Sequence, residues 1–373
     1  MSESKALADV AQFASGKFLP PAQRVADGSV PVYGANGLIG RTLEPSQDAP
    51  VITVGRVGAC GEVHRTQGPA WVSDNALVVQ PKPGVTLDYL YYALQAVDYS
   101  SIKTGTTQPL ITQTALKALR ILVPDDSARQ DEVVATLTAA DEAARCAQSR
   151  FAALTDLERG LADEVFGPAA EQWPRAKLED VAAVDRGVSW AKEQESVRPA
   201  ADRTPVVRIG NVQRDAIDMT DRLYLTGVSE RDRERKALTG RHILMVGSNG
   251  NVERIGNAFR ASAAQEGHVF ASFLIGVRCA DEDAALYTTT WLRAPHVQHR
   301  LRDSTSGSTG LKNLGLKTLR AMELPLAPDP VRKAVIEVAA EIEETRTRLA
   351  TASATARSLK HSLAAEIFER EAV

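Results

Sequence analysis

Two long stretches of the chain carry apolar residues at alternating spacings of four and three. The first stretch contains Val133, Leu137, Ala140, Ala144, Ala147, Phe151 and Leu154. The second contains Val331, Val335, Val338, Ile342, Thr345, Leu349, Ala352, Ala356, Leu359 and Leu363. This alternation is typical of a coiled-coil seam, where alanine allows two helices to approach closely. An amphipathic helix lying on its own domain is the alternative, but two matched helices in one chain favour mutual pairing.

The region before each helical stretch has a different pattern, in which runs of β-branched residues lie between Gly, Pro and Asp. The elements predicted from it are strands at 50–57, 75–81, 242–248 and 270–278, and helices at 88–99 and 283–294. Each region ends at a proline, which is Pro124 in the first half and Pro325 or Pro328 in the second. The two halves therefore share a plan of a mixed, strand-rich region followed by a long helix.

Short passages also recur in the same order in both halves. The matched passages are 7–11 with 178–182, 116–120 with 316–320, and 161–166 with 363–368. A glycine follows the passages 7–11 and 178–182 at the same interval, Gly16 in the first half and Gly187 in the second. Matches at the start, middle and end indicate a tandem duplication with unequal insertions.

We therefore expect an α+β protein with two tandem-duplicated α/β domains and two long helices that form an antiparallel coiled coil with pseudo-twofold symmetry. The expected boundaries are a first domain at 1–124, a central helical region at 125–171, a second domain at 172–327 and a C-terminal helical region at 328–373. A helix of about 40 residues is a rod of ~60 Å. Two globular regions on such a rod suit a long, two-fold-symmetric partner such as duplex DNA, whose half-sites usually lie ~34 Å apart.

Composition and charge fit a soluble globular protein of two domains. The net charge of −3 gives no global argument for nucleic acid. Residues 286–322, however, hold six Lys or Arg against one Asp, which is either a basic surface or a solvated face balanced by acidic helices. Without a secretory signal, a membrane-spanning run or paired cysteine spacing, we expect a cytoplasmic protein whose Cys60, Cys146 and Cys279 are reduced.

The sequence gives no support to catalysis. GRVGACG at 55–61 lacks the order of a dinucleotide-binding loop and predicts a hairpin turn, and STGLKN at 308–313 lacks the Walker spacing. No NPPY-like run that could hold a flipped base is present. His296 and His299 could share a helix face, but no ligand-type residue accompanies them at metal-binding spacing, so we expect no metal site.

Binding is better supported, because a polar loop occurs twice before a short helix. Small hydroxyl residues and Gly allow backbone amides to approach phosphates, while Lys, Arg, Gln and Asn reach base edges. The loop candidates are Lys103, Thr104, Thr106, Thr107 and Gln108 in the first half, and Arg300, Arg302, Ser306, Ser308, Thr309, Lys312 and Asn313 in the second. Further candidates are Asn36, Arg56, Asn75, Asn211, Gln213, Arg214, Ser248 and Asn249. For most of these further residues, a role in turn geometry explains the residue types equally well.

Taken together, these residues resemble the specificity subunits of type I restriction–modification enzymes over essentially the whole chain. The resemblance rests on the duplicated LxDVA openings, the loops GTTQPLI and GSTGLKN with the LKxLR that follows each, and the passages at 31–40, 50–66, 204–218 and 238–259. The family usually has Gly-Asp before the strand at 242–248, whereas this chain has Gly240-Arg241-His242. That departure leaves the local turn open.

The resemblance implies a division of labour between subunits. Two target recognition domains would each read one half of a bipartite, asymmetric site in double-stranded DNA, and the paired helices would set the gap. The chain would be non-catalytic and bind no cofactor. Two methyltransferase subunits that use S-adenosylmethionine would dock on the helices, with two ATP- and Mg-dependent restriction–translocase subunits in the complete enzyme.

Two other classes of function fit parts of the sequence. A two-headed scaffold for protein partners would also have a duplication and a coiled coil. A standalone methyltransferase or nuclease would need an S-adenosylmethionine loop or a carboxylate cluster, and neither pattern is found.

Overall fold

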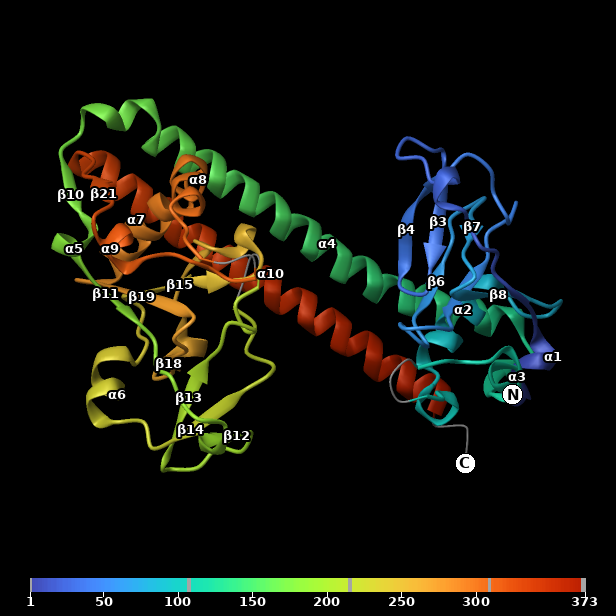
Figure 1. The fold of residues 1–373 in the computed structure, drawn as a ribbon. Helices are drawn as coiled ribbons and strands as arrows, with labels where there is room; N and C mark the ends of the chain where they lie inside the picture. The colour runs from blue at the N-terminus through green and yellow to red at the C-terminus, as the bar shows by residue number, and fades with distance from the viewer. Residues whose placement is uncertain (1, 106–108, 214–216, 308–309, 370–373) are drawn as a thin grey trace. The chain divides into compact units, whose positions relative to one another are not determined.

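The computed structural model describes residues 2–105, 109–213, 217–307 and 310–369. The chain divides into two compact units (Figure 1). The first unit is Met1–Gln148 with Thr351–Val373, and the second unit is Ser149–Ala350. The boundaries between the units fall inside the two long helices and not at the expected segment boundaries, because each long helix contributes about half of its length to each unit.

The first unit contains a four-stranded sheet in the order β2-β8-β5-β6, a three-stranded sheet in the order β4-β3-β7, and the pair β1-β9. Its strands are β1 Ser2–Ala6, β2 Ala11–Ser15, β3 Val30–Gly34, β4 Gly37–Thr42, β5 Ile52–Gly55, β6 Val63–Arg65, β7 Trp71–Val72, β8 Ala76–Pro81 and β9 Arg120–Pro124. Its shorter helices are α1 Leu7–Val10, α2 Leu87–Ala96 and α3 Gln113–Ala118. The strands predicted at 50–57 and 75–81 and the helix predicted at 88–99 are confirmed.

The second unit repeats this topology, with sheets in the orders β11-β19-β15-β17 and β12-β14-β13-β18 and the pair β10-β21. Its strands are β10 Arg175–Lys177, β11 Ala182–Arg186, β12 Glu195–Ser196, β13 Arg203–Val207, β14 Leu223–Thr226, β15 His242–Val246, β16 Ser248–Asn249, β17 Ala258–Arg260, β18 Val269–Phe270, β19 Leu274–Cys279, β20 Lys312–Asn313 and β21 Glu323–Pro325. Its shorter helices are α5 Leu178–Val181, α6 Glu230–Lys236, α7 Glu282–Arg293, α8 Pro295–Asp303 and α9 Leu316–Arg320. The tandem duplication and the α+β class are confirmed.

The repeated glycines Gly16 and Gly187 have a structural reason. A Cβ on Gly16 would lie 1.9 Å from the carbonyl oxygen of Ser73, and one on Gly187 would lie 2.1 Å from that of Phe270. Here the chain leaves β2 or β11 and crosses the end of the neighbouring sheet against main-chain atoms. Since only glycine lacks a Cβ, both repeats need it at this crossing.

The two long helices are α4 Ser127–Phe166 and α10 Asp329–Glu369. In the first unit, Val133 and Leu137 share a core with Leu363 and Phe368, whereas Asp141 pairs with Lys360 at 2.8 Å. In the second unit, Glu158 pairs with Arg346 at 2.5 Å, and Phe166 lies in the same core as Val335. Within each unit, residues of increasing number along α4 contact residues of decreasing number along α10, so the two helices pair antiparallel.

Burial defines the seam of each helix. In α4, the predicted positions are all buried or half-buried, including Phe151 and Leu154. In α10, the line through Val335, Ile342, Leu349 and Ala356 also lies inward. Along the other predicted line, Thr345 is half-buried, whereas Leu359 is 52% exposed and Val331, Val338 and Ala352 are exposed. Ala339, Arg346 and Lys360, which follow Val338, Thr345 and Leu359, are buried or half-buried, and the two cations pair with acidic residues of α4 there.

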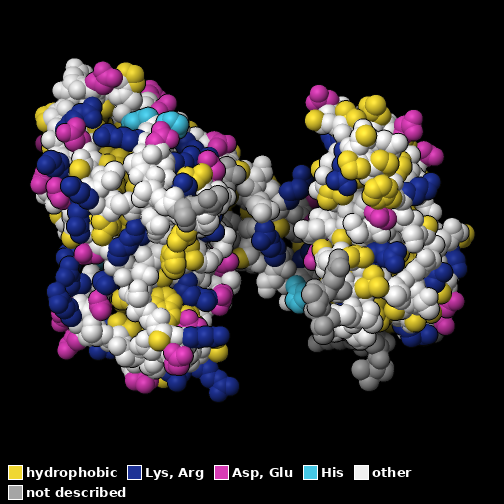
Figure 2. All heavy atoms as spheres, in the orientation of Figure 1, with side chains coloured by type: hydrophobic (Ala, Val, Ile, Leu, Met, Phe, Trp, Pro, Cys, Tyr) yellow, Lys and Arg dark blue, Asp and Glu magenta, His cyan; other side chains and the backbone are white. Residues whose placement is uncertain are grey.

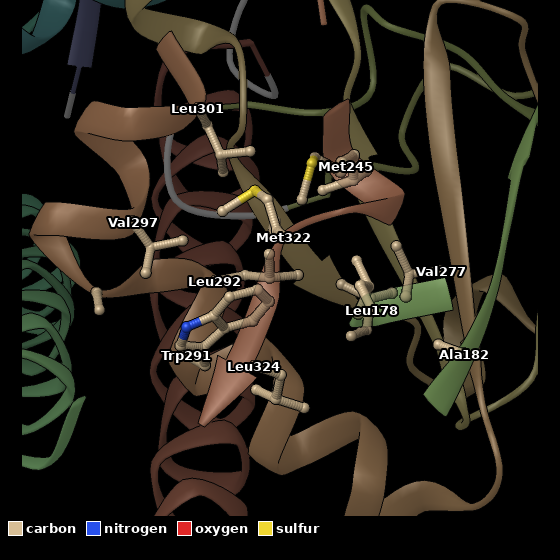
Figure 3. Packing of buried hydrophobic residues seen from close by; sticks show 14 of the residues in the cluster. Leu178, Ala182, Met245, Val277, Trp291, Leu292, Val297, Leu301, Met322 and Leu324 are labelled. Carbon is tan, nitrogen blue, oxygen red and sulfur yellow. The ribbon is translucent and has the colours of Figure 1, made fainter. Parts of the chain in front are cut away.

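The second unit has a core between its sheet and its helices. In Figure 3, Trp291 and Leu292 of α7 and Val297 and Leu301 of α8 lie around Met322 and Leu324. Leu178 of α5 and Met245 of β15 belong to the same cluster. This packing fixes α8 and the approach to α9, the two helices between which the second polar loop runs.

Candidate nucleic-acid interface

In the first unit, the predicted loop is closed at its base by backbone hydrogen bonds. The amide of Thr104 donates to the carbonyl of Leu110 at 3.0 Å, and the amide of Leu110 donates back at 2.8 Å. The amide of Ile111 donates to the carbonyl of Arg56 at 2.9 Å, just beyond the end of β5. Lys103 and Thr104 are exposed. Thr106, Thr107 and Gln108 lie outside the described residues.

Other candidates of the first unit gather at the same end of β5. The amide of Arg56 donates to the carbonyl of Asn75 at 3.0 Å, and Asn75 is exposed. A Cβ on Gly55 would lie 2.5 Å from the carbonyl oxygen of Ala35, which places the turn that carries the exposed Asn36 against this strand end. The fold thus brings Asn36, Arg56 and Asn75 to the base of the 103–108 loop.

The second unit builds the equivalent loop in the same way. The amide of Ser306 donates to the carbonyl of Asn313 at 3.0 Å, and the amide of Asn313 donates back at 2.8 Å. The amide of Leu314 donates to the carbonyl of Gly247 at 2.8 Å, directly after β15. In both repeats, therefore, the residue after the loop is attached to the residue after the central strand.

Two short strands add a further attachment in the second unit. β16 pairs antiparallel with β20, with Ser248 opposite Asn313 and Asn249 opposite Lys312. The Ser248 hydroxyl donates to Oδ1 of Asn313. Nζ of Lys312 donates to the carbonyl of Gly307 at 3.3 Å. Five predicted residues therefore meet at this loop, namely Ser248, Asn249, Ser306, Lys312 and Asn313, while Ser308 and Thr309 lie outside the described residues.

Arg186, at the end of β11, anchors the second loop and was missed from the sequence. Its guanidinium donates to the Ser248 hydroxyl at 3.1 Å and to the carbonyl oxygens of Ser272 at 3.4 Å and Leu314 at 2.7 Å. Burial lowers the pKa of Arg186 from its usual value. The signal in the sequence is that Arg186 directly precedes Gly187, the glycine that recurs at the same interval in both halves.

The first unit uses a thiol for a similar attachment. The Cys60 Sγ lies within hydrogen-bond distance of two carbonyl oxygens, that of Arg56 at 3.0 Å and that of Pro109 at 2.9 Å, and its single S–H can donate to either. Cys60 is buried and reduced. It lies in the connection between β5 and β6, where GRVGACG forms the predicted hairpin turn.

The candidates Asn211 and Gln213 have local partners. The Asn211 amide donates to the carbonyls of Asp218 and Asp221 at 2.9 Å each, and its Oδ1 accepts from the amide of Arg208 at 2.8 Å. Asn211 is also buried, so its side chain holds the connection between β13 and β14, and a contact of Asn211 with DNA stays a prediction. Gln213 is exposed and donates to the carbonyl of Gly210 at 2.7 Å. Arg214 lies outside the described residues.

Arginines of α8 lie at the start of the second loop. Arg300 is exposed, whereas Arg302 is half-buried and pairs with Glu253 at 3.2 Å. Asn249 accepts from the amide of Asn251 at 2.8 Å, a local turn contact.

Charges of both signs are interspersed over the visible faces of both units (Figure 2). Apolar side chains gather on the visible face where Figure 1 shows β3 and β4 (Figure 2). In β4, the side chains of Leu38 and Ile39 are exposed.

His296 and His299, which lie on one helix, have acidic neighbours. His296 Nδ1 lies 3.6 Å from Asp163, and His299 Nε2 lies 3.1 Å from Asp303. Within the described ranges, no group of three or more His, Cys, Asp or Glu could hold a metal ion. In the same part of the chain, no helix is long and apolar enough to cross a bilayer.

The fold and these loops define a tandem-duplicated α+β protein in which each repeat presents a polar loop at the end of its central strand. Residues 2–150 match the family described as the type I restriction modification DNA specificity domain. The predicted resemblance to type I restriction–modification specificity subunits is therefore confirmed, through the match of residues 2–150 to that family's model.

Two individual proteins illustrate this relationship. A stretch of 95 residues is 33% identical to the type I restriction enzyme EcoprrI specificity subunit of Escherichia coli, spanning 25% of this chain and about a quarter of the relative's length. The crystal structure of the type I restriction–modification system S subunit from M. genitalium covers 99% of this chain and 96% of its own, with a TM-score of 0.62 at 15% identity. At that identity the structural likeness shows the shared fold.

Proposed function

We propose that this chain is the specificity subunit of a type I restriction–modification complex and reads a bipartite, asymmetric site in double-stranded DNA. The observation that carries the proposal is the loop that recurs at the end of β5 and β15 with the same backbone attachments. A protein with two equivalent reading loops has the means to recognise two half-sites. The family match over residues 2–150 favours DNA over a protein-only scaffold.

The side chains at each loop suit both components of DNA recognition. Exposed Lys103 and half-buried Lys312 are suited to phosphates or guanine edges, and Asn75 and Asn313 to adenine edges. The two loops differ in their residues, so each would read a different sequence, which makes the combined site asymmetric. Substitutions at 103–108 would therefore affect one half-site, and substitutions at 302–313 the other.

We further propose that α4 and α10 set the gap between the half-sites. Both helices contribute to both units, with 40 and 41 residues. Removing one heptad from each would shorten the preferred gap while leaving both half-sites unchanged. An unchanged gap would rule out this role for the helices.

The chain would act without chemistry of its own. Two methyltransferase subunits would supply S-adenosylmethionine-dependent adenine methylation, and two restriction–translocase subunits would supply ATP- and Mg-dependent cleavage. The helices are the proposed docking surface for the methyltransferase subunits. A cytoplasmic location follows from these partners and from the DNA substrate.

A binding-site selection from random duplex DNA tests the proposal, using this chain purified together with its methyltransferase subunit. We expect a bipartite motif with a fixed gap of unspecified bases. A matched pair of variants, Lys103→Gln and Lys312→Gln, should each relax a different half of that motif. An intact complex that enriches no motif would refute DNA reading by this chain.

A further inference from the structure

An exposed aromatic residue lies at the base of the second loop. Phe273 immediately precedes β19, and it is 45% exposed. Its carbonyl oxygen accepts from the amide of Gly247 at 2.9 Å and from the amide of Ser248 at 3.0 Å. Gly247 and Ser248 directly follow β15, where the amide of Leu314 also attaches the end of the loop. The backbone of Phe273 is therefore fixed to the strand end that carries the second loop.

The first unit has Asn75 at the equivalent position. The carbonyl of Asn75 accepts from the amide of Arg56 at 3.0 Å, just as the carbonyl of Phe273 accepts from the amide of Gly247. The next residues also correspond, because each accepts from the recurring glycine of its repeat, Ala76 from Gly16 at 3.0 Å and Leu274 from Gly187 at 3.3 Å. The duplication thus places an asparagine and a phenylalanine at one position of the two loop bases.

The ring of Phe273 is not part of the core beneath it. Phe270 and Leu274 are 2% and 0% exposed, and among the described residues the cluster that contains them does not include Phe273. An aromatic side chain that stays half in water forgoes part of the free energy of burial. Asn75 is exposed as well. Both repeats therefore present this position to solvent, one with a polar side chain and the other with an apolar one.

The neighbouring position differs in the same direction. Arg56 corresponds to Gly247, because each directly follows the central strand and accepts from the residue after its loop. A Cβ on Gly247 would lie 2.4 Å from Nη1 of Arg186, so a side chain here would displace that guanidinium. The first unit thus has a half-buried cation beside Asn75, whereas the second unit has only backbone beside Phe273.

We infer that Phe273 is a base-reading residue whose ring contacts the 5-methyl group of a thymine in the half-site of the second unit. Thymine presents that methyl group in the major groove, where apolar side chains such as phenylalanine contact it. An asparagine at the same position, such as Asn75, is suited to adenine instead. This inference rests on the proposed function, because it requires that the base of the loop faces DNA bases.

Duplexes in which deoxyuridine replaces thymine test the inference, because the two bases differ only in the 5-methyl group. The chain is purified together with its methyltransferase subunit, and the parent duplex carries the motif that this wild-type complex selects. Each thymine of the motif is replaced in turn. We expect one position at which the replacement weakens binding by about fourfold, the effect of burying one methyl group. It should lie in the half-site that Lys312→Gln relaxes.

Variants of Phe273 assign the methyl contact to this ring. Phe273→Ala should bind the thymine and deoxyuridine duplexes equally, whereas Phe273→Leu keeps an apolar side chain and should retain part of the difference. Phe18→Ala is the matched control, because Phe18 is a 65% exposed phenylalanine of the first unit, and it should retain the full difference. The unfolding midpoint of each variant separates loss of the contact from loss of folding.

The outcomes distinguish this inference from the function on which it rests. A bipartite motif without a methyl-sensitive thymine would overturn the inference and leave the proposed function standing. A methyl preference that persists in folded Phe273→Ala would do the same, as would equal weakening of all sequences by that variant, which would place the ring against the sugar–phosphate backbone. An intact complex that enriches no motif would overturn both.

Discussion

Nη2 of Arg346 in α10 donates to Oε2 of Glu158 in α4 at 2.5 Å, within the seam of the second unit. Lys360 of α10 pairs with Asp141 of α4 in the first unit. In both units, α4 thus supplies the acid and α10 the base. Charges arranged this way favour pairing of α4 with α10 over pairing of either helix with a second copy of itself.

Replacement of Glu158 by Gln should destabilise the second unit. The Glu158 side chain is 7% exposed and receives hydrogen bonds from both Arg293 and Arg346, so the variant removes the counter-charge that these two largely buried cations share. Breaking a buried ion pair in this way costs about 3–5 kcal/mol. The loss would be measured as a fall in the free energy of unfolding in urea.

The control for this prediction is Glu344→Gln. Glu344 is 72% exposed and lies 3.9 Å from Arg348, so its removal should change stability by less than about 1 kcal/mol. Equal effects of the two variants would show that the seam does not depend on the Glu158 carboxylate.

The sequence predicted the repeat, the strands and most of the seam because these depend on local spacing. Val133 and Leu137 repeat at helical intervals, and β-branched runs mark β5 and β15 whatever the tertiary context. The error at Leu359 arose from treating the seam as purely apolar. Lys360 takes the inner position because its charge is met by Asp141, a contact that spacing in one helix cannot reveal.

The candidate site was predicted less completely. The loops at 103–108 and 302–313 were found because they recur, but their anchors Cys60 and Arg186 act across large separations in the chain. Asn211 has the residue type of a base-reading side chain, yet its three hydrogen bonds are all within its own loop. Residue type indicates chemistry, whereas the partners of that residue are decided by the fold.

Replacement of Gly187 by Ala should destabilise the second unit strongly. The new methyl group would lie 2.1 Å from the carbonyl oxygen of Phe270 and 2.3 Å from that of Ala271, which are main-chain atoms of the neighbouring sheet and cannot move alone. We expect a loss of about 2–4 kcal/mol, at the upper end of overpacking effects. Thermal unfolding would measure it.

Gly160→Ala is the control, and we expect it to raise stability where Gly187→Ala lowers it. Gly160 lies in α4 with open space where its Cβ would be, so alanine should stabilise the helix by up to about 1 kcal/mol. If both alanine variants stabilised the chain, the close approach at Gly187 would not be a constraint.

The buried His242 should make stability depend on pH. Burial, and then the nearby positive charge of Arg278, lower the pKa of His242 to about 4, while Nδ1 accepts from the amide of Thr239 at 3.1 Å. The unfolded chain, with a pKa near 6.5, binds the proton more readily than the folded chain. Stability should therefore fall as pH decreases from about 6.5 to about 4, by roughly 2–3 kcal/mol.

Urea unfolding of wild type and His242→Gln across this pH range would measure that contribution. The variant should have a flatter profile, because glutamine does not titrate. Identical slopes for the two proteins would show that His242 is not responsible.

Arg186→Gln should impair reading of one half-site while leaving the other intact. Arg186 connects β11 to Ser248 and to the carbonyl of Leu314, so its loss frees the base of the second loop without touching the first. Contacts that depend on loop position should weaken, with a loss of about 1–3 kcal/mol of discrimination at the affected bases. Binding-site selection with the methyltransferase complex would show a relaxed motif in one half only.

The control is Arg241→Gln, because Arg241 is an exposed arginine that precedes β15, and this variant should leave both halves unchanged. A uniform loss of affinity for all sequences with Arg186→Gln would instead mean that the loop contacts phosphates rather than bases.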